Sequence, residues 1–87
     1  MFKFSAFSHN LSMRKNINVI AKMCETGKII PLKILWDDTL SIEIDNVLDI
    51  RKKASTKGGG AGFRYTCKIK NQERFLWLDG YIWFVEI

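Results

Sequence analysis

Apolar and polar residues alternate with a period of two along most of the chain. The cleanest example is residues 63–70, in which Phe63, Tyr65, Cys67 and Ile69 alternate with basic residues and a threonine. Such alternation is typical of β-strands that bury one face and expose the other. It predicts five to six short strands among seven candidate runs, which are residues 17–23, 28–36, 40–44, 47–53, 63–70, 74–79 and 81–87.

Short polar segments separate these runs and predict tight turns. Glu25–Gly27, Asp37–Thr39 and Asn71–Glu73 are rich in turn-forming residues. Asp79-Gly80 is a strong signal for a two-residue β-hairpin. Short strands joined by tight turns are typical of an antiparallel meander that curls into a small barrel. We therefore expect a mainly β fold, an SH3-like barrel.

The run from 28 to 36 contains the chain's one proline. We expect one face of this strand to carry Ile30, Leu32, Ile34 and Trp36. Because Pro31 lacks the amide donor of a sheet ladder, the strand is expected at a sheet edge or bulged at the proline.

Residues 45–54 fit two kinds of secondary structure. As a strand, this segment places Leu48 and Ile50 on one face. As a short helix, it places Val47, Leu48, Ile50 and Arg51 at a 3.6-residue period. Short apolar runs do not separate these alternatives, so one short helix stays open here.

The chain of 87 residues is long enough for one small domain. Its hydrophobic fraction of 47% is too high for an intrinsically disordered chain. We place an N-terminal extension at residues 1–14 and a β domain at residues 15–87, because the composition changes between them. Two interpretations of the extension stay open: translation that starts at Met13, or a short strand in which Phe2 and Phe4 alternate.

Cysteine and histidine are too sparse for a disulfide framework or a zinc site. A secreted domain of this size would normally carry several disulfides, whereas this chain has Cys24 and Cys67, far apart in sequence. We expect buried thiols in the reducing cytoplasm, with a Cys24–Cys67 disulfide as the alternative. A zinc site needs three or four ligands, and His9 is the one histidine. We expect no metal, no cofactor and, without a run of ~20 apolar residues, no membrane partner.

No arrangement of residues predicts catalysis. Asp37 and Asp38 are adjacent in a turn-like segment, and the serines have no paired base. Alternation places Cys67 on the core face of its strand, where a lowered thiol pKa is not expected. We therefore expect the protein not to be an enzyme.

The net charge of +5 is unevenly distributed. Residues 25–50 carry two basic and six acidic residues, a net charge of −4, whereas residues 51–74 carry eight basic residues and Glu73, a net charge of +7. The positive charge of this block favours a nucleic-acid partner. Strand residues two apart are ~7 Å apart, which is close to the spacing of phosphates along a nucleic-acid strand. The candidate nucleic-acid or anion-binding residues are Arg51, Lys52, Lys53, Lys57, Arg64, Lys68 and Lys70.

The basic block has alternative interpretations. Lysines on the outer face of a strand also keep it soluble and block edge-to-edge pairing. The glycine-rich loop 57–62 fails as a Walker A motif, because its lysine precedes the glycines and a strand follows. It is either a flexible hairpin connection or a mobile binding loop. Tyr65, Trp77 and Trp83 are candidates for base stacking where they are exposed.

The C-terminal hairpin is apolar on both faces. Trp77 lies between two leucines, and Trp83 lies between an isoleucine and Phe84. One face must join the core, and the other needs a cover. A candidate interaction surface of Trp77, Trp83 and Phe84 therefore predicts a homodimer or another protein partner, with a closed barrel of large inner volume as the alternative.

Three segments of the chain are similar to segments of a known protein family. Pro31–Trp36, Ala54–Cys67 and Trp83–Glu86 resemble a family of short bacterial proteins of unassigned function, over roughly residues 17–87. The resemblance implies no activity. From the residues themselves we expect a non-enzymatic binding module with nucleic acid as the first candidate partner. The alternative is a protein-interaction or homo-oligomerisation domain that uses the aromatic hairpin.

Overall fold

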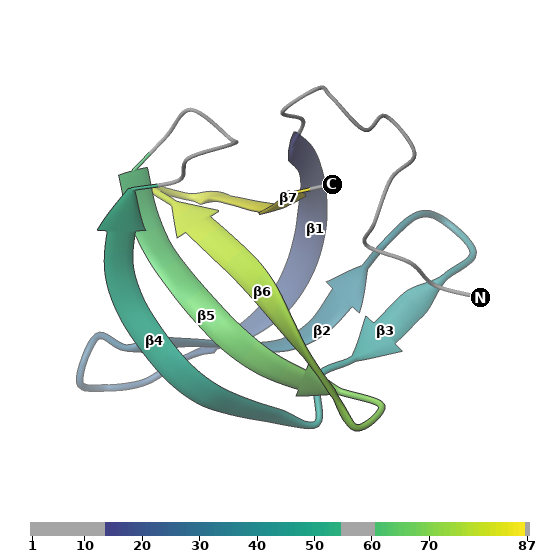
Figure 1. Cartoon of the computed structure of the whole chain (residues 1–87), viewed down its shortest axis with the longest axis horizontal. Coiled ribbons are helices and arrows are strands. Elements are labelled where there is room, and N and C mark those ends of the chain that lie inside the picture. The colour runs from purple at the N-terminus through teal and green to yellow at the C-terminus, as the bar shows by residue number, and fades with distance from the viewer. Residues whose placement is uncertain (1–13, 55–60, 87) are drawn as a thin grey trace.

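Residues 14–54 and 61–86 are described by the computed structural model. They form the strands β1 (Arg14–Met23), β2 (Ile29–Leu35), β3 (Ser41–Glu43), β4 (Asn46–Ala54), β5 (Ala61–Ile69), β6 (Gln72–Asp79) and β7 (Ile82–Glu86), shown in Figure 1. No described residue is helical, so none belongs to a helix long and apolar enough to cross a membrane. The predicted mainly β fold is confirmed, with seven strands in place of the five to six expected, and the segment that also fitted a helix forms β4.

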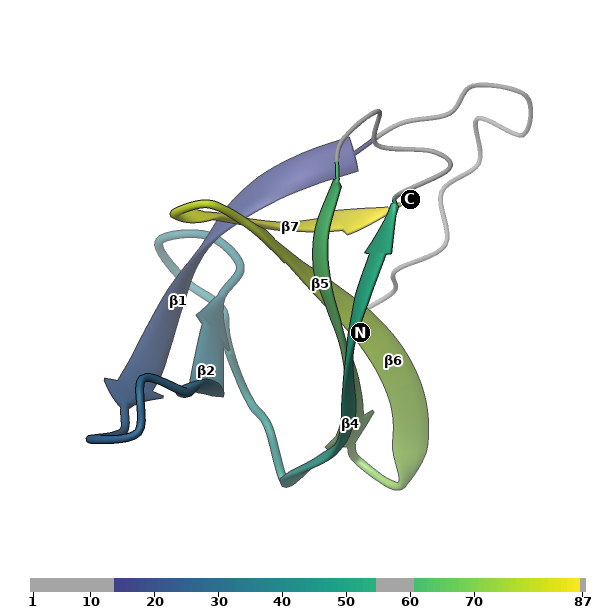
Figure 2. The same ribbon diagram turned by 90° about the vertical axis from the view of Figure 1, so that its left-hand side faces the viewer.

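All seven strands join one antiparallel sheet in the order β3-β2-β1-β7-β6-β5-β4. The sheet consists of two meanders, β1 to β3 and β4 to β7, which meet where β1 pairs with β7. The sheet curls into an open barrel, with β1 and β2 on one side and β4, β5 and β6 on the other (Figure 2). The predicted antiparallel barrel-like curl is confirmed.

The two edges of the curled sheet are tied together at one end. Ile44 and Asp45 connect edge strand β3 directly to edge strand β4. The amide of Ile44 donates to the carbonyl oxygen of Leu32 in β2 at 3.0 Å. The amide of Asp45 donates to the carbonyl oxygen of Lys68 in β5 at 2.8 Å. This short connection therefore links the two edge strands at one end of the open barrel.

The inner face of the sheet holds the core. Its buried apolar side chains alternate along the strands, as the sequence predicts. They are Ile17, Ile34, Ile42, Tyr65, Cys67, Ile69, Leu76, Leu78, Trp83 and Val85. Cys24 and Cys67 are free thiols, so the alternative of a disulfide between them is wrong.

β-Bulges interrupt the alternation in β2 and β4. The register of β1 and β2 shifts so that Ile20 faces Lys33 and Ala21 faces Pro31. Leu32 has no cross-strand partner in β1 and is exposed, whereas Ile34 is buried. The expected bulge at Pro31 is confirmed, but the expectation that Leu32 and Ile34 share a face is wrong, because the extra residue changes the parity of the strand.

A second bulge lies between Val47 and Asp49 in β4. It leaves Leu48 exposed, while Val47 and Ile50 pack against the core. The prediction that Leu48 and Ile50 share a face is therefore wrong for the same reason: the bulge inserts one residue between two inward-facing positions.

The connections between β5, β6 and β7 are two-residue turns. Asp79 pairs with Ile82, so Gly80 and Tyr81 form the turn, and Gly80 has a φ of 63°. The predicted two-residue hairpin is confirmed, but its turn lies one residue later than the predicted Asp79-Gly80, because Asp79 is still paired. Lys70 and Asn71 form the β5–β6 turn with φ values of 50° and 64°. Two left-handed residues are typical of a type I′ turn, whose twist suits a hairpin.

Candidate nucleic-acid interface

The basic residues of β4 and β5 gather on the outer face of the sheet. Tyr65 and Cys67 point into the core, so Arg64 and Lys68 point outward on the same strand. In the register of the sheet, Arg51 lies opposite Arg64, and Lys53 lies opposite Gly62. We call Arg51, Lys53, Arg64 and Lys68 the basic face.

The other predicted anion-binding residues lie elsewhere. Lys52 pairs with Phe63 and therefore belongs to the inner side of β4, where its side chain is exposed near the barrel opening. Lys70 is exposed in the β5–β6 turn, and its amide donates to Asp45 Oδ2 at 3.0 Å. Lys57 lies outside the described residues. The structure thus brings part of the predicted set onto one face.

Two arginines face each other across β4 and β5. Like charges in directly opposite positions repel, so the Arg51–Arg64 pair costs stability unless an anion compensates it. Arg51 Nε donates to Asp49 Oδ2 at 2.7 Å, which offsets part of this charge. Both side chains of that ion pair are solvent-exposed, and exposed pairs contribute little. Arg51 thus engages a carboxylate on its own strand, while the guanidinium group of Arg64 lies over a ring on β6.

Arg64 also lies over an aromatic ring. Its guanidinium carbon is 4.3 Å from the ring centroid of Phe75 in β6, within the range of a cation–π contact. Phe75 pairs with Thr66, and its side chain is 49% exposed. The sequence-based candidates for stacking did not include Phe75. The sequence could have indicated Phe75 as a stacking candidate, because it lies two residues before Trp77 and so shares the face of that candidate.

Buried donors lie next to this stack. Arg64 is opposite Trp77 in the sheet, and Arg64 Nε and Trp77 Nε1 are buried without a hydrogen-bond partner among the described residues. Trp77 stacks on Phe84 of β7, with 5.9 Å between centroids and 9° between planes. Arg14 covers Phe84, with its guanidinium carbon 4.0 Å from the ring centroid. A row of rings therefore crosses the outer face, and Phe75 is its exposed member.

Acidic residues compensate the basic face unevenly. Glu73 lies opposite Lys68, and Asp49 pairs with Arg51. Lys53 lies opposite Gly62, so no acidic side chain faces it on β5. On β6, Asp79 lies beside Gly62 and is 3.9 Å from Arg14.

Most of the acidic block, residues 25–50, lies away from the basic face. Glu43 on β3 is 3.7 Å from Lys33. Asp37, between β2 and β3, accepts bonds from the amide and hydroxyl of Thr39 at 2.8 and 2.9 Å. The amide and side-chain bonds from Thr39 lower the pKa of Asp37. The Asp37 carboxylate therefore stabilises the turn between β2 and β3.

The aromatic hairpin buries the residues predicted as an interaction surface. Trp77, Trp83 and Phe84 are 5%, 9% and 1% exposed within the single chain. Trp83 lies on the inner face, 5.2 Å from Tyr65 between ring centroids. The exposed aromatic side chains of this hairpin are instead Phe75 and Tyr81.

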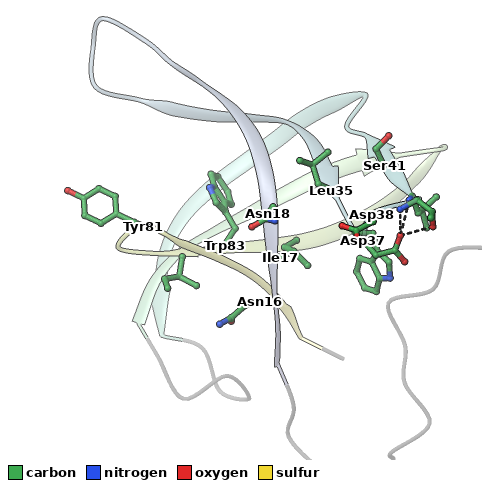
Figure 3. A pocket seen from close by; sticks show the side chains of 13 residues that line it. Asn16, Ile17, Asn18, Leu35, Asp37, Asp38, Ser41, Tyr81 and Trp83 are labelled. Atoms are coloured by element: carbon green, nitrogen blue, oxygen red, sulfur yellow. Dashed lines mark hydrogen bonds between the residues drawn. The ribbon is translucent and has the colours of Figure 1, made fainter.

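Two hollows lie outside the basic face. A groove of about 940 Å³ runs between the start of β2 and edge strand β4, lined by apolar side chains that include Ile29, Leu48 and Phe63. A polar hollow of about 590 Å³ crosses β1 between the β2–β3 and β6–β7 turns, with Asn16, Asn18, Asp38, Ser41 and Tyr81 among its lining residues (Figure 3). The groove is apolar and lies beside β4, which ends the sheet formed by residues 14–54 and 61–86.

The described residues contain no cluster of side chains that could hold a metal ion. None of their histidine, cysteine, aspartate and glutamate side chains form a group of three placed to hold a metal ion. Burial raises the pKa of the Cys67 thiol to about 12, so this group is a protonated core residue at neutral pH. Comparison with protein-family models, with curated proteins and with solved structures finds no significant match.

Proposed function

We propose that the protein is a non-enzymatic nucleic-acid-binding module that uses the basic face. The observation that carries this proposal is the Arg51–Arg64 pair beside the half-exposed ring of Phe75. Cationic side chains that track a phosphate backbone, together with an aromatic ring for bases, are the usual components of sequence-tolerant nucleic-acid binding. The setting we propose is the reducing cytoplasm, which suits the free thiols of Cys24 and Cys67.

The spacing along β4 supports phosphate contacts. Arg51 and Lys53 are two residues apart on one face of a strand, hence ~7 Å apart at the backbone. Arg64 lies across from Arg51 on β5, so the cations form a triangle rather than a line. A bound phosphate between the two arginines would relieve their repulsion, and this relief favours binding over a bare solvated face.

A salt titration with matched variants tests the proposal. Fluorescence anisotropy would measure binding of a labelled mixed-sequence oligonucleotide from about 50 to 200 mM salt, because each phosphate contact adds about −0.7 to the log–log slope for single strands. The test variant replaces Arg51, Lys53 and Lys68 with alanine. The control variant replaces Lys22, Lys28 and Lys33 and so changes the net charge equally.

The expected slope of the test variant is shallower than that of the wild type by about 2, whereas the control variant keeps nearly the wild-type slope. This result would show that the affinity for the oligonucleotide depends on where the positive charges lie and not on the net charge alone. Absence of salt-dependent binding by the wild type would refute the proposal. So would an equal loss in both variants, because the charges would then act through net charge alone.

Self-association is a second candidate, favoured by the free edge of β4. This strand ends the sheet formed by the described residues and lies beside the apolar groove. Antiparallel pairing of two β4 strands about Ile50 would place Arg51 opposite Asp49 of the second copy, a favourable cross-strand pair. This interface uses the strand edge, while Trp77, Trp83 and Phe84 stay buried within the single chain.

Sedimentation velocity tests self-association directly. We expect a dimer in the wild type and a monomer in Leu48→Lys, because an added lysine on an edge strand opposes pairing. Leu32→Lys is the control, since Leu32 is likewise an exposed bulge residue but lies on β2. A wild-type monomer at the highest soluble concentration would exclude this candidate.

Two finer predictions from the sequence belong to this proposal. One is that the barrel is SH3-like. The open, curled antiparallel sheet is compatible with this prediction. The other is membership of a family of short bacterial proteins of unassigned function, carried by Pro31–Trp36, Ala54–Cys67 and Trp83–Glu86. Neither changes the expected partner.

A further inference from the structure

We infer that the basic face selects single-stranded over duplex nucleic acid, because a base joins the stack formed by Arg64 and Phe75. This inference rests on the proposed function and adds the class of nucleic acid that is bound. Its carrying observation is the guanidinium–phenyl contact of 4.3 Å at a ring that is 49% exposed.

The chemistry of Phe75 sets the kind of contact. A phenyl ring has no hydrogen-bonding atom, so it can bind a base through the face of the base but cannot read its edge. In a duplex the base faces are covered by neighbouring base pairs. In a single strand they are available to aromatic rings and to the plane of an arginine side chain. A half-exposed phenylalanine on the outer face can therefore stack on the bases of a single strand but not on the paired bases of a duplex.

Arg64 contributes both a plane and a donor. The guanidinium group is planar and stacks on aromatic faces, which a lysine ammonium cannot do. Arg64 Nε has no hydrogen-bond partner among the described residues although it is buried. A buried unpaired donor is costly. A small rotation of this side chain that brings Nε–H to a phosphate oxygen recovers the bond when a strand is bound.

The neighbouring cations place the backbone of the strand next to this stack. Arg51 lies across from Arg64 on β4, and Lys53 follows two residues later on the same face. Phe75 lies on β6, on the other side of β5. Phosphates on the β4 side and a base on the β6 side place the nucleotide across β5, so one nucleotide engages both parts of the face.

The test compares single strands with duplexes of the same sequence. Oligonucleotides of about a dozen nucleotides cover the usual site size of a small β domain. Anisotropy titrations at fixed salt would use the full chain and the variants Phe75→Ala, Phe75→Trp, Arg64→Lys and Arg51→Ala. Near-ultraviolet circular dichroism of each variant confirms that its tertiary structure is retained.

Wild type and Phe75→Trp are expected to prefer the single strand, and the fluorescence of the introduced tryptophan is quenched by single strands but not by duplexes. Phe75→Ala is expected to lose roughly five- to a hundredfold in single-strand affinity, with little change for the duplex. Arg64→Lys keeps the charge and loses the preference. Arg51→Ala weakens both complexes by a similar factor.

The outcomes separate this inference from the proposed function. Equal affinity of the wild type for single strands and duplexes, with no effect of Phe75→Ala, overturns single-strand selection while salt-dependent binding by the basic face stands. Absence of binding to either form overturns both. A duplex preference that disappears in Arg51→Ala also overturns the inference, because the arginines would then recognise paired backbones.

Discussion

The hydroxyl group of Tyr65 on β5 donates a hydrogen bond of 2.6 Å to the carbonyl oxygen of Ile29 on β2. β5 and β2 are not neighbours in the sheet, so this bond crosses the interior of the open barrel. Together with the Ile44 and Asp45 amide bonds, it holds the two sides of the curl in place. The bond therefore joins two strands that the sheet itself does not pair.

Replacing Tyr65 with phenylalanine should destabilise the protein by about 1 kcal/mol, because it removes one partly buried hydrogen bond and keeps the ring in the core. Urea denaturation followed by tryptophan fluorescence would measure the change. Tyr81→Phe is the control, since Tyr81 is 99% exposed. Equal stability of Tyr65→Phe and wild type would show that the bond across the barrel contributes nothing.

Gly62 allows β5 to approach β6 closely. A Cβ atom at this position would collide with the carbonyl oxygen of Leu78, which is backbone and cannot simply rotate away. Gly62→Ala should therefore cost roughly 1–3 kcal/mol, the usual effect of forcing a backbone shift. Gly80→Asn is a suitable comparison, because no heavy atom lies within 4 Å and asparagine tolerates its φ of 63°. A larger loss at Gly80 than at Gly62 would contradict this close approach.

The β5–β6 turn is formed by residues that are not optimal for it. Lys70 and Asn71 both have positive φ, whereas type I′ turns favour asparagine followed by glycine. The double change Lys70→Asn and Asn71→Gly should raise the free energy of unfolding by about 1 kcal/mol, since it removes left-handed strain at a residue with a long side chain. Thermal denaturation would measure it, and a lower melting temperature would argue against the turn type.

The buried thiol of Cys67 makes stability depend on alkaline pH. Burial raises its pKa from 9.0 to about 12 in the folded chain. Above pH 9 the unfolded chain loses this proton while the folded chain keeps it. The stabilisation is thus complete below pH 9 and is lost as the pH rises toward 12, with a slope of at most about 1.4 kcal/mol per pH unit.

Urea midpoints measured between neutral pH and pH 11 would reveal this slope. Cys67→Ala should show a shallower decline, whatever its stability at neutral pH. Some slope should persist, because burial and then the neighbouring Cys67 charge raise the pKa of Tyr65 as well. An identical pH profile in the variant would show that Cys67 does not titrate as a buried group.

Much of the strand layout could be predicted from the sequence. Alternation along β5 predicted the burial of Tyr65, Cys67 and Ile69, because the register of β5 with β6 is uninterrupted and every second residue faces the core. The faces of Leu32 and Leu48 could not be predicted, since a bulge inserts one residue and reverses the parity that follows. The pairing of β1 with β7 is also a long-range contact that local patterns do not encode.

The candidate site was predictable in part. The concentration of basic residues in β4 and β5 is visible in the sequence, but whether they share a face depends on register. Lys52 and Lys53 are adjacent and so fall on opposite sides of β4. The burial of Trp77 was not predictable, because Phe84 stacks on it from a strand whose pairing had to be known. Phe75 is identified as a stacking residue by the position of its exposed ring beneath Arg64, which depends on the three-dimensional structure.

The most direct test of binding at the basic face uses tryptophan side chains as reporters in nuclear magnetic resonance. Trp77 lies on the outer face opposite Arg64, whereas Trp83 belongs to the core and Trp36 packs against it. In a titration with a single-stranded oligonucleotide, the indole N–H signal of Trp77 and the Nε–H signals of Arg51 and Arg64 should shift together. The indole signals of Trp36 and Trp83 should stay in place. Shifts confined to Trp36 and Trp83, or no shift at saturating oligonucleotide, would contradict binding at the basic face.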